Sequence, residues 1–338
     1  MTIDLAPSLV ARYTSVAELS QRPVAPHRPR RRGRRAALSA RDVVTVMICE
    51  QGHGRSERGF VRCARQYWRG YFPGLLDQSA FTRRGRDLPG TLTPLVPLGA
   101  DELGATMASA QGMDGVGMPL ARRSRGLHHR RCGDEAGIGR GGTDKDGVFG
   151  GPVVLSCAPT GAITGGVVGP AATEERGLAE AWACWRTDPN ARPWDGQHHR
   201  LPPSHQRGGR QRGPTGPSWP RDGAGPATPA PTLADRGDRG RPWQAPGRDA
   251  DGTVILTTDT YPGDQAPAAR RQQHGRRQIV ETVNGIREQT CHRHVPTAHP
   301  LWGLRARLAA KPLAFNRGLR LNTRFGRDLL ACSLLAPC

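Results

Sequence analysis

Residues 187–230 restrict what this chain can fold into, because they hold almost no material for a hydrophobic core. The stretch is low in complexity and consists largely of proline, glycine, arginine and histidine, and it includes the basic run 205–212. Such a composition cannot bury enough apolar surface to offset the entropy lost on ordering the chain. Its length also exceeds that of an ordinary loop in a compact domain. We therefore expect a flexible basic loop here and a core assembled from the residues on either side.

The whole chain is basic and poor in apolar residues. Its hydrophobic fraction is 36%, with 44 glycines and 30 prolines among 338 residues, so we expect one modest core with long irregular stretches. The net charge is +20, and lysine occurs only at Lys145 and Lys311, so nearly every basic residue is arginine. Arginine binds phosphate oxygens in a bidentate manner, which indicates nucleic acid as a partner. A GC-rich genome would produce the same bias without selection for binding, so charge alone does not decide.

Cysteine spacing and hydropathy predict a soluble, intracellular protein. The eight cysteines show no CxxC spacing, which is typical of reduced residues in the cytoplasm. No apolar run reaches the roughly 18 residues of a membrane span, and the N-terminus lacks a signal-peptide core, so no membrane partner is expected. Residues 122–140 are interpreted as a basic loop. The alternative is a zinc site formed by two clusters, which are His128, His129 and Cys132, and Cys291, His292 and His294.

The N-terminal part predicts a basic arm and then a helical module. Residues 1–38 contain the arginine-rich run 28–35, and such runs are usually disordered until they meet phosphate. Residues 39–100 form the module, in which Ser39 is a suitable N-cap for a helix. Residues 89–112 read as a loose connection with three prolines.

A second helix is predicted from Ser56 to Gly70, and its two sides differ in character. Its basic side carries Arg62 and Arg65, which could lie on a DNA backbone. The apolar side is expected to hold Phe60, Cys63, Ala64 and Tyr67, and the basic side also holds Arg58 and Arg69.

The middle of the chain contains the best strand signals. Val153–Cys157 and Ile163–Val168 are β-rich runs joined by turn residues, which is typical of a hairpin. Thr173 is placed to cap a helix that reaches Trp185, and Val254–Leu256 is a further short strand.

Two helices are predicted near the C-terminus. In 276–291, Ile279, Val283 and Ile286 recur at helical spacing, which would bury one stripe and leave Glu281 on its border. Arg277 lies one turn before Glu281 on the same face. The second helix runs from Pro300 to about Ala310, and Pro312 is expected to break or kink it.

Four segments resemble parts of bacterial insertion-sequence transposases of the DDE class, and the first, YFPGLLDQSAFTRR at 71–84, is similar to the family's N-terminal helical region. The strongest is HGRRQIVETVN at 274–284, followed by LWGL and LAAK at 301–304 and 308–311, where Arg277 and Glu281 match the family's R-x-x-x-E arrangement. The MDGV segment around Asp114 is similar to the family's first catalytic strand, and LAD at 233–235 is similar to its second catalytic position. Competing acids for that second position are Asp238, Asp249 and Asp251.

This resemblance implies an α/β fold with an RNase H-like mixed sheet and flanking helices over residues 101–296, followed by a helical region at 297–338. It implies metal-dependent cleavage and strand transfer of double-stranded DNA, which serves as transposon ends and as target. The implied location is the bacterial cytosol, at the nucleoid. A homodimer on DNA is compatible with this activity. The implied catalytic and metal-binding residues are Asp114, Asp235 and Glu281, with Mg²⁺ or Mn²⁺ as the cofactor. The residues expected to contact DNA are Arg276, Arg277 and Arg287, together with Arg62 and Arg65.

A second function stays open at this point. The chain could be a noncatalytic arginine-rich nucleic-acid-binding protein, or a decayed and inactive transposase copy. This alternative is favoured by the poor strand sequences before Asp114 and Asp235, by His274 where the family has tyrosine, and by Pro312 where the family continues a helix.

Overall fold

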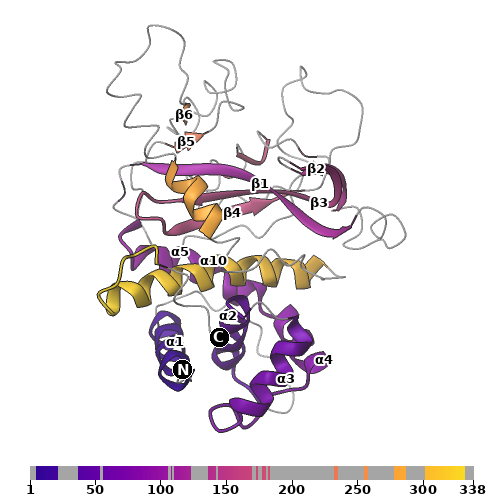
Figure 1. Ribbon diagram of the computed structural model, residues 1–338, viewed down its shortest axis with the longest axis vertical. Helices are drawn as coiled ribbons and strands as arrows, with labels where there is room; N and C mark the ends of the chain where they lie inside the picture. Colours follow the sequence, from indigo (N-terminus) through magenta and orange to yellow (C-terminus); the bar gives the residue numbers. More distant parts are fainter. Residues whose placement is uncertain are drawn as a thin grey trace, which may run out of the picture. The chain divides into compact units, whose positions relative to one another are not determined.

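The computed structural model describes residues 5–21, 37–53, 56–105, 108, 110–122, 136–141, 144–169, 173, 177–179, 182, 232–234, 255–257, 278–286 and 301–331. The chain divides into two compact units, one helical and one built on a sheet (Figure 1). The helical unit comprises Met1–Leu103, Asn284–His294 and Trp302–Cys338, and the sheet unit comprises Gly104–Val283 and Val295–Leu301. The mixed α/β class is confirmed. The C-terminal region, predicted as a separate part, belongs to the same unit as the N-terminal helices.

The helical unit contains predicted and unpredicted helices. The predicted starts are confirmed: Ser39 and Asp42 form a capping box at the first turn of α2, and the Ser56 hydroxyl accepts a hydrogen bond from the Gly59 N–H at the start of α3. The helices are α1 (Leu5–Gln21), α2 (Ala40–Gln51), α3 (Glu57–Tyr67), α4 (Gln78–Arg86), α5 (Pro89–Asp101) and α10 (Leu301–Arg324).

Helix α1 lies within the segment predicted to be a basic arm. Its buried stripe mixes Leu9, Val16 and Leu19 with the polar Arg12 and Ser15, so the segment does not show a clean apolar period. The polar members are accommodated because other helices supply partners for them. The arginine-rich run 28–35 lies outside the described residues.

Helix α5 replaces the predicted loose connection at 89–112. Pro89 stands in its first turn, where a missing N–H costs little. Pro94 and Pro97 lie inside the helix, and an internal proline costs about 3 kcal/mol. Leu92, Leu95 and Val96 are buried, and each such burial contributes roughly 1.5–3 kcal/mol. The burial is therefore large enough to offset the prolines.

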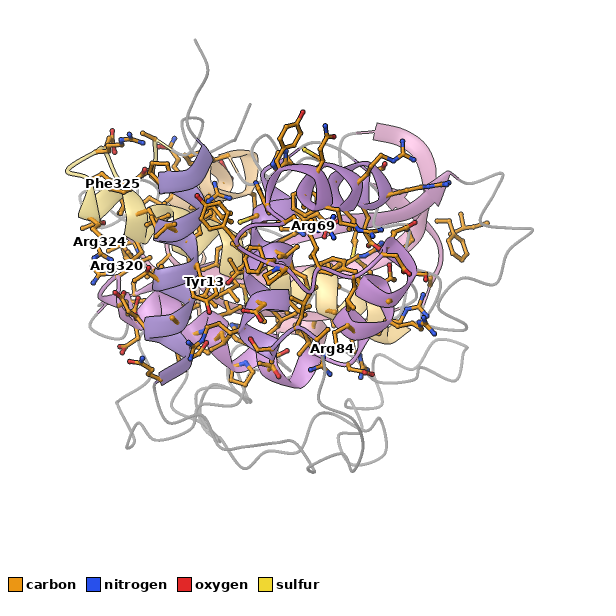
Figure 2. The ribbon with its side chains drawn as sticks, turned by 90° about the horizontal axis from the view of Figure 1, so that it is seen from below. Tyr13, Arg69, Arg84, Arg320, Arg324 and Phe325 are labelled. Atoms are coloured by element: carbon orange, nitrogen blue, oxygen red, sulfur yellow. The ribbon has the colours of Figure 1, made fainter. Side chains whose placement is uncertain are left out.

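Helix α10 continues through Pro312, so of the two outcomes expected there, a break or a kink, the break is wrong. Buried residues occur around its whole circumference, as is typical of a helix in the centre of a core. Its C-terminal end leaves the core, and Figure 2 shows Arg320, Arg324 and Phe325 close together there. The tertiary environment of α10 stabilises the helix despite the hydrogen bond that Pro312 cannot donate.

A buried arginine connects α10 to α1 and α5. Arg317 is 1% exposed, and its guanidinium donates to the Ser15 hydroxyl at 3.1 Å and to the Gly99 carbonyl at 3.2 Å. The same group lies 2.7 Å from the Glu102 carboxylate, which follows α5. Arg320 also reaches Glu102, at 3.7 Å, but is 41% exposed. Two arginines of different burial thus share one carboxylate.

We expect Arg317→Met to lower the free energy of unfolding of the helical unit by about 3–5 kcal/mol, because it leaves buried polar partners uncompensated. Arg320→Met is the matched control and should cost less than about 1 kcal/mol, since its ion pair with Glu102 is solvent-exposed. Urea unfolding followed by helical circular dichroism measures both. Equal losses for the two variants would contradict a special role for Arg317.

A second charged cluster joins α2, α3, α4 and α10. The Glu57 carboxylate accepts a hydrogen bond from Thr82 and pairs with Arg307. Glu50 lies close enough to feel these charges: burial raises its pKa to about 7, repulsion by Glu57 adds to the rise, and Arg307 and Lys311 oppose it. Glu50 therefore titrates near neutral pH in the folded protein.

The raised pKa of Glu50 predicts a pH-dependent stability. The pKa of Glu50 is 4.5 in the ordinary case and about 7 in the folded protein. At pH values between these two, folded Glu50 holds a proton that the unfolded chain has lost, so the free energy of unfolding falls as pH rises. Glu50→Gln should remove this decline and raise the free energy of unfolding at pH 8 by up to about 3 kcal/mol, with little effect at pH 4.5. Glu18→Gln, at an exposed carboxylate of α1, is the control in the same denaturation series. A Glu50→Gln variant that was less stable at pH 8 would overturn the assignment.

The sheet unit is a six-stranded mixed sheet. Strands β1, β3, β2 and β4 pair antiparallel, whereas β5 runs parallel to β1 and β6 runs parallel to β5. The order is β2-β3-β1-β5-β6, and β4 also pairs with β3. The strands are β1 (Gln111–Arg122), β2 (Gly137–Gly141), β3 (Asp144–Cys157), β4 (Ile163–Val168), β5 (Thr232–Ala234) and β6 (Ile255–Thr257).

The strand predictions are partly confirmed. The β3–β4 hairpin has the predicted turn, with Gly161 at a φ of 85° that favours glycine. The predicted loop 122–140 instead ends in a strand, because residues 137–141 pair with β3. Backbone hydrogen bonding to a neighbour can recruit a segment that has poor intrinsic strand propensity.

Both faces of this sheet are covered by helical residues. Trp182 packs against Gly165, where an added Cβ would lie 2.2 Å from its ring. Gly165 is opposite Ser156, which is opposite Met113, so Trp182 lies on the Met113 face. Helix 278–286 covers the other face (Figure 1). This arrangement explains why the adjacent residues Val153 and Val154 are both buried.

Candidate functional site

Asp114 lies on the central strand of the sheet unit. β1 has β3 on one side and β5 on the other, and Asp114 is half-buried opposite Leu155. Side chains alternate along a strand, so Asp114 points to the same face as Gly112, two residues earlier. Whatever packs on Gly112 therefore lies on the face of the sheet that carries this carboxylate.

Helix 278–286 packs on Gly112. A Cβ added to Gly112 would lie 3.2 Å from the Cβ of Val280, which is 1% exposed. The missing side chain thus allows a close approach between the helix and the strand. Glu281, the next residue after Val280, is exposed. The helix that carries Glu281 consequently covers the face of β1 that carries Asp114.

The buried side of this helix differs from the predicted one. Val280, Val283 and Asn284 are buried, whereas Ile279 and Ile286 are only partly buried. The buried residues have a spacing of three and four, as predicted, but the stripe is rotated by about one residue. Apolar character alone favoured the isoleucines, and the glycine on β1 selects Val280 instead.

Strand β5 runs alongside the start of β1. The parallel register pairs Thr232 with Gln111 and Leu233 with Gly112, so the C-terminal end of β5 is next to the stretch that leads to Asp114. Asp235 follows Ala234 directly in the sequence and lies outside the described residues. The competing acids Asp238, Asp249 and Asp251 lie outside them as well.

The buried thiol of Cys157 shares this face. Cys157 pairs with Gly112 across β1 and β3, and its sulfur lies 3.7 Å from the position of an added Gly112 Cβ. Burial raises the pKa of the thiol to about 12, and the nearby charge of Asp114 adds to the rise. Cys157 therefore stays a neutral thiol at physiological pH. No sequence pattern indicates this proximity, because it arises from the register of two strands.

Asp114 on this face and Glu281 on the helix that covers it offer oxygen donors of the kind that a hard divalent cation binds. Asp114 and Glu281 are carboxylates, which Mg²⁺ and Mn²⁺ prefer. Among the described residues, no group of three His, Cys, Asp or Glu side chains is clustered closely enough to hold a metal ion. The third predicted ligand, Asp235, lies outside that part of the chain, as do the residues of the alternative zinc site at 128–132 and 291–294.

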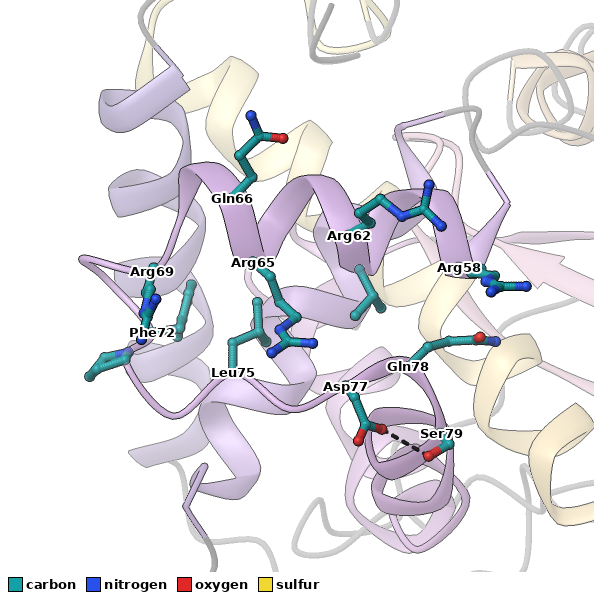
Figure 3. A pocket seen from close by; sticks show the side chains of 12 residues that line it. Arg58, Arg62, Arg65, Gln66, Arg69, Phe72, Leu75, Asp77, Gln78 and Ser79 are labelled. Atoms are coloured by element: carbon teal, nitrogen blue, oxygen red, sulfur yellow. Dashed lines mark hydrogen bonds between the residues drawn. The ribbon is translucent and has the colours of Figure 1, made fainter.

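A groove lined by arginines runs along α3 in the helical unit (Figure 3). Arg62 and Arg65, predicted to contact DNA, are exposed and line it together with Arg58 and Arg69. Asp77 is the one acidic residue in its lining. The other arginines predicted to contact DNA, Arg276, Arg277 and Arg287, lie outside the described residues.

The opposite side of α3 is packed into the helical unit. Phe60, Val61 and Ala64 are buried, followed by Trp68 beyond the helix end. Tyr67, predicted to be buried, is 64% exposed, and Cys63 is only partly buried. Packing of α3 thus follows the line from Phe60 to Trp68, whose rings lie 5.5 Å apart edge to face.

Comparison with models of known protein families, with curated proteins and with solved structures finds no significant match to this chain. In the described part of the chain, none of the helices is both long and apolar enough to cross a membrane. The residues and their geometry are therefore what a functional proposal must be built on.

The packing of Val280 on Gly112 can be tested with a double-mutant cycle. Gly112→Val should lower the free energy of unfolding of the sheet unit by about 1–3 kcal/mol through overpacking. The double variant Gly112→Val/Val280→Ala should lose at least about 0.5 kcal/mol less free energy of unfolding than the sum of the losses of the two single variants. The control combines Gly112→Val with Val16→Ala in the helical unit, where the effects should add. Additivity in both pairs would mean that helix 278–286 does not pack on β1 at this point.

Proposed function

We propose that this protein is a transposase of the DDE class that cleaves and joins DNA with divalent metal ions, using an RNase H-like domain. The observation that carries the proposal is the close approach of helix 278–286 to β1 at Gly112, on the face that carries Asp114. The proposed substrate is double-stranded DNA, as transposon ends and target, in the bacterial cytosol. A homodimer on DNA is compatible with this function.

The strand arrangement supports the RNase H-like proposal. In such a sheet the first acid lies on a central strand, the second follows the end of a neighbouring strand, and the third lies on a helix that crosses them. Here Asp114 is on the central β1, Asp235 follows β5 in sequence, and Glu281 is on the helix that packs on β1. Acids that are far apart in the sequence would thereby serve one site.

In this proposal Asp114, Asp235 and Glu281 hold Mg²⁺ or Mn²⁺. Two bound ions would activate the attacking oxygen and stabilise the leaving oxygen of a phosphodiester. Asp114 lies on a strand that pairs with β3 at Asp114 itself and with β5 at Gln111 and Gly112, which limits the movement of its backbone. Glu281 is exposed, and its side chain is therefore accessible to a polyanionic substrate. Arg277, one turn earlier in the sequence, would orient Glu281 or contact a phosphate.

The test is cleavage of transposon-end DNA with Mg²⁺. Asp114→Asn and Glu281→Gln should each reduce the rate about 100-fold or more, because metal ions contribute several kcal/mol of transition-state stabilisation and about 1.4 kcal/mol corresponds to a tenfold change. DNA binding should be retained. Glu18→Gln, the same chemical change at an exposed carboxylate of α1, should cleave at the parental rate. Cleavage by Glu281→Gln at the parental rate would overturn the assignment.

A noncatalytic nucleic-acid-binding protein is the second candidate, and the arginine groove favours it. The groove lies wholly within the helical unit and requires neither Asp114 nor Glu281. If this candidate is correct, the purified chain binds DNA without Mg²⁺-dependent cleavage, and neither carboxylate variant changes its behaviour.

A further inference from the structure

Arginines form a row along one wall of the groove. Arg58, Arg62 and Arg65 follow one another on α3 at intervals of four and three residues, which places them on one side of the helix, and Arg69 follows in the turn after the helix end. The three helical arginines cover about 10 Å, since a helix rises 1.5 Å per residue. All four side chains are exposed, and Figure 3 shows Arg58, Arg62 and Arg65 projecting from successive turns.

The other wall is formed by the chain from Phe72 to Ser79. Phe72 and Leu75 supply apolar surface, and Gln78 and Ser79 supply polar groups at the start of α4. Asp77 is the N-cap of α4 and offsets one of the four arginine charges, so the described lining of the groove keeps a net positive charge. It accepts hydrogen bonds from the Ala80 N–H and the Ser79 hydroxyl, both at 2.8 Å, and these bonds, with a smaller effect of Arg65, lower its pKa.

The shape of the site limits what can enter it. The groove encloses about 700 Å³, which is within the range of pockets that take small ligands. A helix that recognises duplex DNA projects into a major groove about 12 Å wide, whereas the arginine row of α3 faces a second wall of its own protein. A narrow polyanion that presents charges at regular intervals suits this pair of walls.

We propose that this groove binds the sugar–phosphate backbone of a single nucleic-acid strand. The groove is lined by four arginines and one aspartate, so its excess positive charge complements a row of phosphates. Guanidinium groups bind phosphate oxygens in a bidentate manner. Apolar surface at Phe72 and Leu75 accommodates sugar and base edges. Arg58 and Arg69 thereby extend, at both ends, the DNA contact predicted for Arg62 and Arg65. The groove binds a single strand in preference to a duplex. The assignment is independent of the carboxylates of the sheet unit.

The experiment measures binding of the full chain to a fluorescent oligothymidylate of about 12 nucleotides, within the size range of single-strand sites, and to a blunt duplex of the same length. The wild type should prefer the single strand. Arg62→Glu/Arg65→Glu should weaken single-strand binding at least tenfold. Arg62→Gln/Arg65→Gln should reduce the slope of log affinity against log salt by about 1.4, or about 0.7 per lost phosphate contact.

The matched control is Arg83→Glu/Arg86→Glu. These two arginines are exposed on α4, carry the same charge change and do not line the groove. The control should bind the single strand within about twofold of the wild type, so a loss as large as that of Arg62→Glu/Arg65→Glu would show a general charge effect and overturn the proposal. Circular dichroism confirms that each variant is folded, and Arg58→Gln/Arg69→Gln provides a second groove pair.

Three further outcomes would also overturn the proposal. Unchanged single-strand binding by both groove pairs would mean that the groove is not the site. Duplex binding that is as tight as single-strand binding, and lost in the same variants, would identify the duplex as the occupant. Equal competition by polyglutamate would identify an acidic peptide. None of these results depends on Mg²⁺-dependent cleavage, so failure here is distinguishable from failure of the transposase proposal.

Discussion

The close approach of a helix to the centre of the sheet depends on the absence of a side chain at Gly112. The contact distance between Val280 and an added Cβ leaves no room for a larger residue without movement of the helix. Because strand side chains alternate, the same contact determines which face of β1 the helix covers, and that face carries Asp114 and Cys157. One missing side chain thus links the packing of the sheet unit to the placement of its candidate catalytic carboxylates.

The helical unit is stabilised in a different way. Polar groups take part in its core beside the apolar residues: the buried Arg317 bridges α10, α1 and α5, and the largely buried Glu57 pairs with Arg307 between α3 and α10. A buried ion pair of this kind adds little net stability compared with apolar packing, but it strongly penalises arrangements in which one partner is lost. Such contacts favour a single arrangement of the helices, and this holds α3 with its arginine row facing outward.

The two candidate sites use the charge of the chain differently. On the sheet unit, Asp114 lies on the face of β1 that the Glu281 helix covers, and in the proposed function these carboxylates would hold the cations that neutralise a polyanionic substrate. On the helical unit, the arginine row of α3 supplies positive charge directly from the protein. A protein that cleaves DNA needs both kinds of surface, whereas a simple binding protein needs only the second.

Local sequence determined the features that depend on neighbouring residues. The caps at Ser39 and Ser56 and the β3–β4 hairpin follow from side chains that bond to nearby backbone or tolerate a turn. Tertiary structure decided where helices persist through Pro94, Pro97 and Pro312, because burial can offset a lost hydrogen bond only when a partner surface is present. It also decided that Val280 rather than Ile279 faces the sheet, and that Cys157 lies near Asp114. Those outcomes depend on contacts between residues distant in the chain, which hydrophobic period and propensity do not encode.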